Sequence, residues 1–175
     1  MSECADRVRA LIRDVVDFPK PGIVFKDLTP VLSDGEAFAS IVDALVERFE
    51  PMRPTRVVGI EARGFILGAP VAYRLRAGFV PARKKGKLPW QTESIAYELE
   101  YGTENLELHR DALGPDDRVL LIDDVLATGG TAAAALSLVA QLGAEVVGAG
   151  FIIELGFLNG RSKLTGVEPY SLVTY

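Results

Sequence analysis

The sequence predicts an α/β protein with a mostly parallel, twisted sheet flanked by helices. Short apolar runs alternate along the chain with longer segments of helical periodicity, the order typical of repeated strand–helix–strand units. The run 146–153 is almost continuously apolar, as expected of an inner strand covered on both faces. We therefore expect core strands at about 56–60, 78–83, 118–123 and 145–154.

Length and composition predict one soluble globular domain over 1–175. The chain has 49% hydrophobic and 25% charged residues and a net charge of −5, which argues against a broad nucleic-acid or anionic-membrane surface. One cysteine and one histidine exclude an internal disulfide, a thiolate metal cluster and a multi-histidine metal site. No apolar run is long enough to cross a bilayer and no signal peptide is visible, so we expect the cytoplasm.

A small N-terminal hood over about 1–33 is expected to precede a core over about 34–175. Apolar residues at helical spacing predict a helix over about 2–16, and the proline-rich segment 18–22 ends it. The irregular stretch that follows contains Phe25, either as a core plug or as a face on which a planar base could stack. A capping-box spacing, Ser33 to Glu36, then predicts a helix to about Phe49.

Two strand ends in the first half of the core carry cations. The strand 56–60 leads into a loop with Arg63, and the strand 78–83 leads into a basic run that contains Lys84 and Lys87. On spacing alone, Arg63 is as well explained as a solvated loop cation. The basic run is either a solvated face or a site for a polyphosphate, because parallel strands end at one edge of a sheet.

Alternating polar and apolar residues over 94–108 predict a β-hairpin with a polar outer face. After the central strand and helix, Gly143 is placed to cap the helix at its C-terminus. A short helix at about 159–164 and a last strand at about 169–175 complete the predicted elements.

The chain is organised around the segment 119–135, VLLIDDVLATGGTAAAA. A buried strand ends in two carboxylates, Asp123 and Asp124, and a short glycine-containing loop opens an alanine-rich helix. The free N–H groups at the start of that helix favour an anion, whereas carboxylates suit sugar hydroxyls or a hydrated cation. This combination predicts a site for a phosphorylated sugar. The alternative is a tight strand-to-helix turn with two solvated acids.

The same segment resembles the phosphoribosyl-pyrophosphate motif of the type I phosphoribosyltransferases. The resemblance implies that Asp123 and Asp124 hold the ribose hydroxyls, and that a loop wraps the 5′-phosphate with Ala127, Thr128, Gly129, Gly130 and Thr131. It also implies contacts between the substrate and Arg63, Lys84 and Lys87.

Two further stretches resemble the adenine-specific members of this family. The run 18–32, FPKPGIVFKDLTPVL, is similar to their hood segment. That similarity implies an adenine-binding set of Val24, Phe25 and Lys26, although the family more often carries arginine at the last position. Leu99 to Gly102 matches the family's mobile catalytic loop, which is expected over about 84–108. This match implies that Glu100 is catalytic, because it would hydrogen-bond the base at N7 and transfer the proton there.

The resemblance implies that the chain converts adenine and 5-phosphoribosyl 1-pyrophosphate to AMP and pyrophosphate. It implies Mg²⁺ as cofactor, held through substrate and water near the two aspartates without a direct protein ligand set, and a homodimer. One alternative is a transferase of the same fold for guanine, xanthine or orotate. The other is a non-catalytic regulator that senses the sugar pyrophosphate or a purine, for which this acidic chain offers no nucleic-acid surface.

Overall fold

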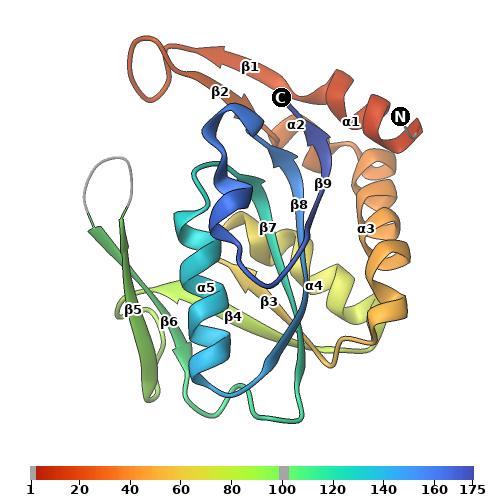
Figure 1. Ribbon diagram of the computed structural model, residues 1–175. Helices are drawn as coiled ribbons and strands as arrows, with labels where there is room; N and C mark the ends of the chain where they lie inside the picture. The colour runs from red at the N-terminus through yellow and green to blue at the C-terminus, as the bar shows by residue number, and fades with distance from the viewer. Residues whose placement is uncertain (1–2, 99–102) are drawn as a thin grey trace. The chain divides into compact units, whose positions relative to one another are not determined.

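The computed structural model describes residues 3–98 and 103–175 (Figure 1). The chain divides into two compact units, Met1–Ala44 and Leu45–Tyr175. Each unit is described by itself.

The first unit contains a helix, a two-stranded hairpin and the start of a longer helix. Its elements are α1 (Glu3–Leu11), β1 (Arg13–Val16), β2 (Val24–Asp27), α2 (Thr29–Ser33) and the first part of α3 (Gly35–Phe49). The expected helix over 2–16 is wrong beyond Leu11, because β1 pairs antiparallel with β2 as far as Val16 opposite Val24. Valine is β-branched and suits a strand, so the helical spacing of the apolar residues was misleading here.

Helix α3 is capped by Asp34 and not by Ser33, which ends α2. The Asp34 carboxylate accepts a hydrogen bond from the Ala37 backbone N–H at 2.8 Å. That bond, more than the nearby Arg7 guanidinium, holds the pKa of Asp34 below its ordinary value. The capping position therefore lies one residue later than the capping-box spacing indicated.

The second unit is built on a sheet that has seven strands among the described residues, in the order β5-β6-β4-β3-β7-β8-β9. The strands are β3 (Arg56–Ile60), β4 (Gly78–Lys84), β5 (Thr92–Glu98), β6 (Thr103–His109), β7 (Arg118–Leu126), β8 (Glu145–Glu154) and β9 (Pro169–Thr174). From β4 to β9 the neighbours are parallel, and the β5–β6 hairpin joins one edge antiparallel. The predicted mostly parallel sheet and the edge hairpin are confirmed.

Two long helices, α4 (Arg63–Leu75) and α5 (Gly130–Gln141), cover opposite faces of the sheet (Figure 1). The chain moves from β3 to β4 in one direction across the sheet and from β7 to β8 in the other. Right-handed crossovers in opposite directions place their helices on opposite faces. The carboxyl ends of β3 and β7 therefore flank a topological switch point, where ligands bind in sheets of this kind.

Strand β7 forms the centre of the core. Its residues Val119 to Ile122 are all 0% exposed, so the segment that leads into the predicted site is fixed by packing on both faces. Short 3₁₀ turns complete the unit: η1 (Glu50–Met52), η2 (Gly156–Leu158) and η3 (Gly160–Lys163). Within the described part of the chain, no helix combines the length and the apolar character needed to cross a bilayer.

Candidate active site

The junction between β7 and α5 differs from the expected one in where the strand ends. Strand β7 continues to Leu126, three residues beyond the predicted end at 123, because its pairing with β8 continues as far as Leu126 opposite Glu154. Asp123 and Asp124 therefore lie inside the strand and do not follow it. Of the two, only Asp123 lines the pocket at this junction.

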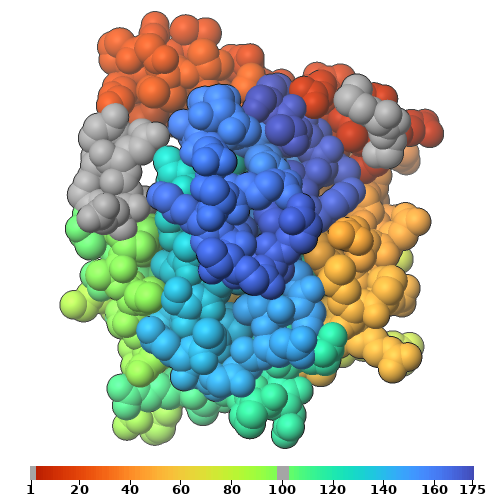
Figure 2. Space-filling view, in the orientation of Figure 1, coloured from red at the N-terminus to blue at the C-terminus, as the bar shows by residue number. Residues whose placement is uncertain are grey.

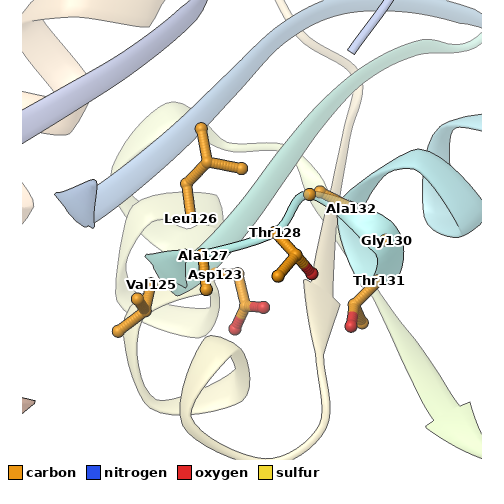
Figure 3. Close-up of a pocket in the computed structure, with 9 residues that line it drawn as sticks. Asp123, Val125, Leu126, Ala127, Thr128, Gly130, Thr131 and Ala132 are labelled. Atoms are coloured by element: carbon orange, nitrogen blue, oxygen red, sulfur yellow. The ribbon is translucent and has the colours of Figure 1, made fainter. Parts of the chain in front are cut away.

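The loop Ala127–Gly129 and the first turn of α5 form a small pocket. Gly129 is the N-cap of α5, with a left-handed φ of 78° that glycine adopts without strain. The pocket has a volume of about 70 Å³ and is lined by Asp123, Val125, Leu126, Ala127, Thr128, Gly129, Gly130, Thr131 and Ala132. Figure 3 shows the Asp123 carboxylate and the hydroxyls of Thr128 and Thr131 on one side of the loop, with Leu126 pointing to the other.

This arrangement is suited to a phosphate group. The first N–H groups of α5 have no partner within the helix, and the positive end of the helix dipole favours an anion there. Thr128 and Thr131 add hydroxyl donors beside the backbone. The structure thus brings together all five of the loop residues that the sequence resemblance singled out, together with Asp123.

Asp123 is partly buried, and its environment disfavours its charge. Burial, followed by the neighbouring Asp124 carboxylate, raises the pKa of Asp123 well above 3.8. One of its oxygens, Oδ1, accepts a hydrogen bond from the Asp124 backbone N–H at 2.9 Å. A carboxylate of this kind gains from an arriving hydroxyl donor or cation, which a sugar diol or a hydrated Mg²⁺ would supply.

Asp124 is 7% exposed and pairs with Arg63. The Arg63 Nη1 atom lies 2.9 Å from Asp124 Oδ2, although the contact lacks the angles of a hydrogen bond and Oδ2 accepts none within the described residues. The ion pair connects the start of α4 to β7, across the switch point. Arg63 thus lies at the edge of the sheet where the sequence placed it, with its charge already balanced by a carboxylate.

The basic turn, defined as residues 84–87, is exposed and held by acidic side chains. Arg83 contacts both oxygens of Glu61, at 3.1 and 3.2 Å, and Arg83 Nη1 donates to the Lys87 carbonyl at 3.1 Å. The Arg83 hydrogen bonds hold the pKa of Glu61 below its ordinary value. Lys84 Nζ lies 2.8 Å from Glu104 Oε1, which raises the pKa of Lys84. Both predicted lysines are therefore at the surface, and Lys84 is paired.

The remaining predicted residues lie elsewhere. Val24, Phe25 and Lys26 belong to β2 in the first unit and are described apart from the pocket. Val24 is 48% exposed, the Phe25 ring packs edge-on against Phe18 with centroids 5.3 Å apart, and Lys26 Nζ donates to Asp14 at 2.7 Å. Glu100 lies outside the described residues.

Sequence reasoning missed several residues of the site. Val125, Leu126 and Ala132 line the pocket, but their apolar side chains fitted the core pattern equally well. Glu61 and Glu104 hold Arg83 and Lys84. Neither glutamate had a local signal, because each pairing joins segments about twenty residues apart.

Known proteins are similar to this chain in sequence and in fold. The model of the phosphoribosyl transferase domain matches residues 31–164. The adenine phosphoribosyltransferase of Anaeromyxobacter dehalogenans is 59% identical over 170 residues, which cover 97% of this chain and 99% of that protein.

Solved structures agree. The crystal structure of adenine phosphoribosyltransferase from Rhodothermus marinus is 52% identical, with a TM-score of 0.93 over 98% of each chain. The Giardia lamblia enzyme in complex with 9-deazaadenine is 38% identical, with a TM-score of 0.94 over 99% of each chain. These matches cover nearly the whole length on both sides. The chain therefore belongs to the phosphoribosyl transferase family, in its adenine phosphoribosyltransferase branch.

Proposed function

We propose that this chain transfers the phosphoribosyl group of 5-phosphoribosyl 1-pyrophosphate to adenine, with AMP and pyrophosphate as products. The observation that carries the proposal is the pocket at the β7–α5 junction, where a phosphate cradle lies beside the Asp123 carboxylate. The adenine phosphoribosyltransferases that match over nearly the full length support adenine as the base, as does the relative bound to 9-deazaadenine.

In this reaction, adenine N9 forms a bond to the anomeric carbon of the sugar while the bond from that carbon to pyrophosphate breaks. The transition state has cationic character on the sugar, so the protein contributes chiefly by holding the reactants in line and neutralising the departing pyrophosphate. The loop around Gly129 is proposed to fix the 5′-phosphate, and Asp123 and Asp124 are proposed to hold the ribose hydroxyls. Arg63, Lys84 and Lys87, which follow the carboxyl ends of β3 and β4, are proposed to act on the pyrophosphate.

Glu100 is proposed to accept the proton that leaves adenine N7 when N9 forms its new bond. Val24 and Phe25 are proposed to bind the base, and Lys26 to assist there. These roles come from the family motifs that the residues match. Replacing Glu100 with alanine should lower turnover by about 10²–10⁴-fold, the usual range for an acid–base group.

Mg²⁺ is the proposed cofactor, and the donor set fits an ion carried mainly by the substrate. Magnesium prefers oxygen ligands, keeps several waters and often binds through one or two carboxylates together with substrate phosphates. The ion is proposed to be held through substrate and water near the two aspartates, of which Asp123 lines the pocket and Asp124 is paired with Arg63. When bound, the ion would neutralise charge on the pyrophosphate.

We further propose that the two units act as one phosphoribosyltransferase domain that forms a homodimer in the cytoplasm. Helix α4 supports the dimer: Ile66 is 47% exposed and Tyr73 is 82% exposed, seven residues apart on one helical face. A single cysteine means that folding requires no oxidising compartment. Sedimentation equilibrium of the wild type and of Tyr73→Glu would test the dimer, and a wild-type monomer would overturn it.

The decisive experiment measures pyrophosphate release with Mg²⁺, the activated sugar and one base at a time. We expect release with adenine and none with guanine, xanthine or orotate. The double variant Asp123→Asn/Asp124→Asn should lose binding of the sugar pyrophosphate. Turnover with another base would reassign the base specificity, and a double variant of normal affinity would remove the sugar contact from the mechanism.

A further inference from the structure

The backbone of the segment after β8, residues 155–164, contacts the loop of residues 127–131, which we name the phosphate loop. A Cβ atom added to Gly160 would collide with the Ala127 carbonyl oxygen and would lie 2.8 Å from the Gly129 backbone nitrogen. The contact is reciprocal, because a Cβ atom at Gly129 would collide with the Gly160 carbonyl oxygen and lie 3.0 Å from Gly160 Cα. Two glycines, distant in sequence, thus let two backbones touch without side chains between them.

We name residues 155–164 the buttress. It begins with a backbone hydrogen bond from Leu155 N–H to the Leu126 carbonyl at 2.9 Å, at the end of β7. Asn159 then adopts a left-handed φ of 52°, and this turn delivers Gly160 to the loop. In the space-filling view the blue segment that follows β8 lies directly against the cyan helix α5 (Figure 2).

A bidentate ion pair anchors the buttress. Arg161 Nε and Nη2 donate to the two oxygens of Glu154 at 3.0 and 2.7 Å, and Glu154 is only 7% exposed. Arg161 Nη1 also donates to Glu168 at 2.6 Å and to the Pro169 carbonyl at 2.9 Å. The buried Glu154 carboxylate and the Pro169 carbonyl therefore hold the residue that directly follows Gly160, with the exposed Glu168 as a third acceptor, and the planar guanidinium is suited to such a set.

The phosphate loop needs support of this kind. Its two glycines provide no side chains that could pack and hold the backbone, yet its N–H groups must be aimed at the ligand to within about 0.5 Å. The neighbouring helix α5 fixes only the C-terminal side of the loop. The buttress adds backbone contacts along the loop, at Ala127 and Gly129.

We propose that Arg161 and Glu154 are positioning residues for the 5′-phosphate: through Gly160 they hold the phosphate loop in its binding geometry. Neither side chain lines the pocket. The inference rests on the proposed function, since it assumes that the loop binds the sugar phosphate. It predicts a defect confined to that phosphate, because the basic turn that acts on pyrophosphate lies on other strands.

The test compares Arg161→Lys and Glu154→Gln with a matched control, Arg118→Lys. Arg118 has a similarly exposed side chain, 41% against 39%, and also pairs with a glutamate, Glu145, and a backbone carbonyl, that of Met52. It lies at the start of β7, at the opposite edge of the sheet from the pocket. Arg118→Lys should therefore destabilise the fold about as much as the two buttress substitutions do, without disturbing the phosphate loop.

Affinity for ribose 5-phosphate and, separately, for magnesium pyrophosphate is measured by calorimetry, well below the melting temperature of each variant. We expect Arg161→Lys and Glu154→Gln each to bind ribose 5-phosphate about 10-fold more weakly, with pyrophosphate affinity unchanged. The double variant should lose little more than either single one, because the two residues form one contact. In the full reaction, KM for the sugar pyrophosphate should rise while kcat stays within about 3-fold.

Each outcome decides one point. A wild-type protein that binds no ribose 5-phosphate would overturn the proposed function itself. If the wild type binds it and the buttress variants bind it equally well, or if Arg118→Lys loses as much affinity, the positioning role is wrong. Should Arg161→Lys fail to fold, Glu154→Gln, which keeps the hydrogen-bonding shape of the side chain, gives the same decision.

Discussion

The phosphate loop and the basic turn both face anions in the proposed reaction, but they are built in different ways. The phosphate loop is proposed to bind with backbone N–H groups and two threonine hydroxyls, and its backbone leads into α5 and contacts the buttress. The basic turn is proposed to bind with long cationic side chains at the surface, and Glu104 already pairs with one of them, Lys84. The first is closely packed and has Asp123 as the one ionisable side chain of its pocket lining, and the second is charged and exposed.

The difference follows from the two halves of the substrate. A phosphate that stays attached to the sugar throughout the reaction benefits from a fixed cradle, since a fixed donor loses no entropy on binding. A pyrophosphate that must leave benefits from cations that can exchange partners. We expect the exposed Lys84 to exchange Glu104 for an arriving phosphate. We expect the two regions to respond differently to a glycine-to-alanine substitution, to salt and to pH.

The largest effect is expected when one methyl group is added to the phosphate loop, with the same addition in the basic turn as its control. Gly129→Ala places a Cβ against the Gly160 carbonyl at a φ of 78°, so we expect affinity for ribose 5-phosphate to fall about 100-fold, as for a misplacement near 1 Å. Gly86→Ala is the matched control in the basic turn, with a φ of 76° and open space around the new atom. It should cost about 1 kcal/mol of backbone strain and change pyrophosphate affinity by less than about 3-fold. Equal losses of affinity in the two variants would contradict the difference in rigidity.

A smaller effect is expected from salt. Raising the ionic strength from about 0.05 M to about 0.5 M screens exposed charges strongly, so pyrophosphate affinity should fall several-fold more than ribose 5-phosphate affinity. Lys87→Gln should weaken pyrophosphate binding by roughly 3-fold at low salt and by little at high salt. Identical salt dependence for the two ligands would show that the cations do not distinguish the two regions.

The smallest effect concerns stability against pH, where the two regions should have opposite signs. The folded pKa of Glu61 lies below 4.5, so its pairing with Arg83 stabilises the protein fully above pH 4.5, and this contribution is lost as the pH falls through the folded value. The folded pKa of Asp123 is raised above 3.8, so its charge destabilises the protein above the raised value, and the penalty disappears as the pH falls toward 3.8.

Thermal melts of two variants across this range would measure both effects. At neutral pH, Glu61→Gln should melt below the wild type and Asp123→Asn above it, with both differences shrinking as the solution is acidified. A difference of the same sign for both variants would contradict the opposite pKa shifts, in which the fold favours the charged form of Glu61 and disfavours that of Asp123.

Local patterns predicted most of the architecture. The strand Arg56–Ile60, the end of α3 at Phe49 and the strand Glu145–Glu154 coincide with the predicted ranges, because their apolar periodicity and their turn residues agree. The first helix failed at β1, where pairing with β2 overrode helical spacing. The predicted end of β7 failed for a similar reason, since pairing with β8 carried two charged residues into the sheet.

The sequence by itself determined the order of the elements and the chemistry of the phosphate loop, since a glycine pair and two threonines at a helix start are local features. Only the tertiary structure decided that Asp123 faces the pocket while Asp124 faces Arg63, and that Gly160 supports Gly129. The physical reason is that such contacts join residues far apart in the chain. Their energies depend on distances and burial that no local pattern encodes.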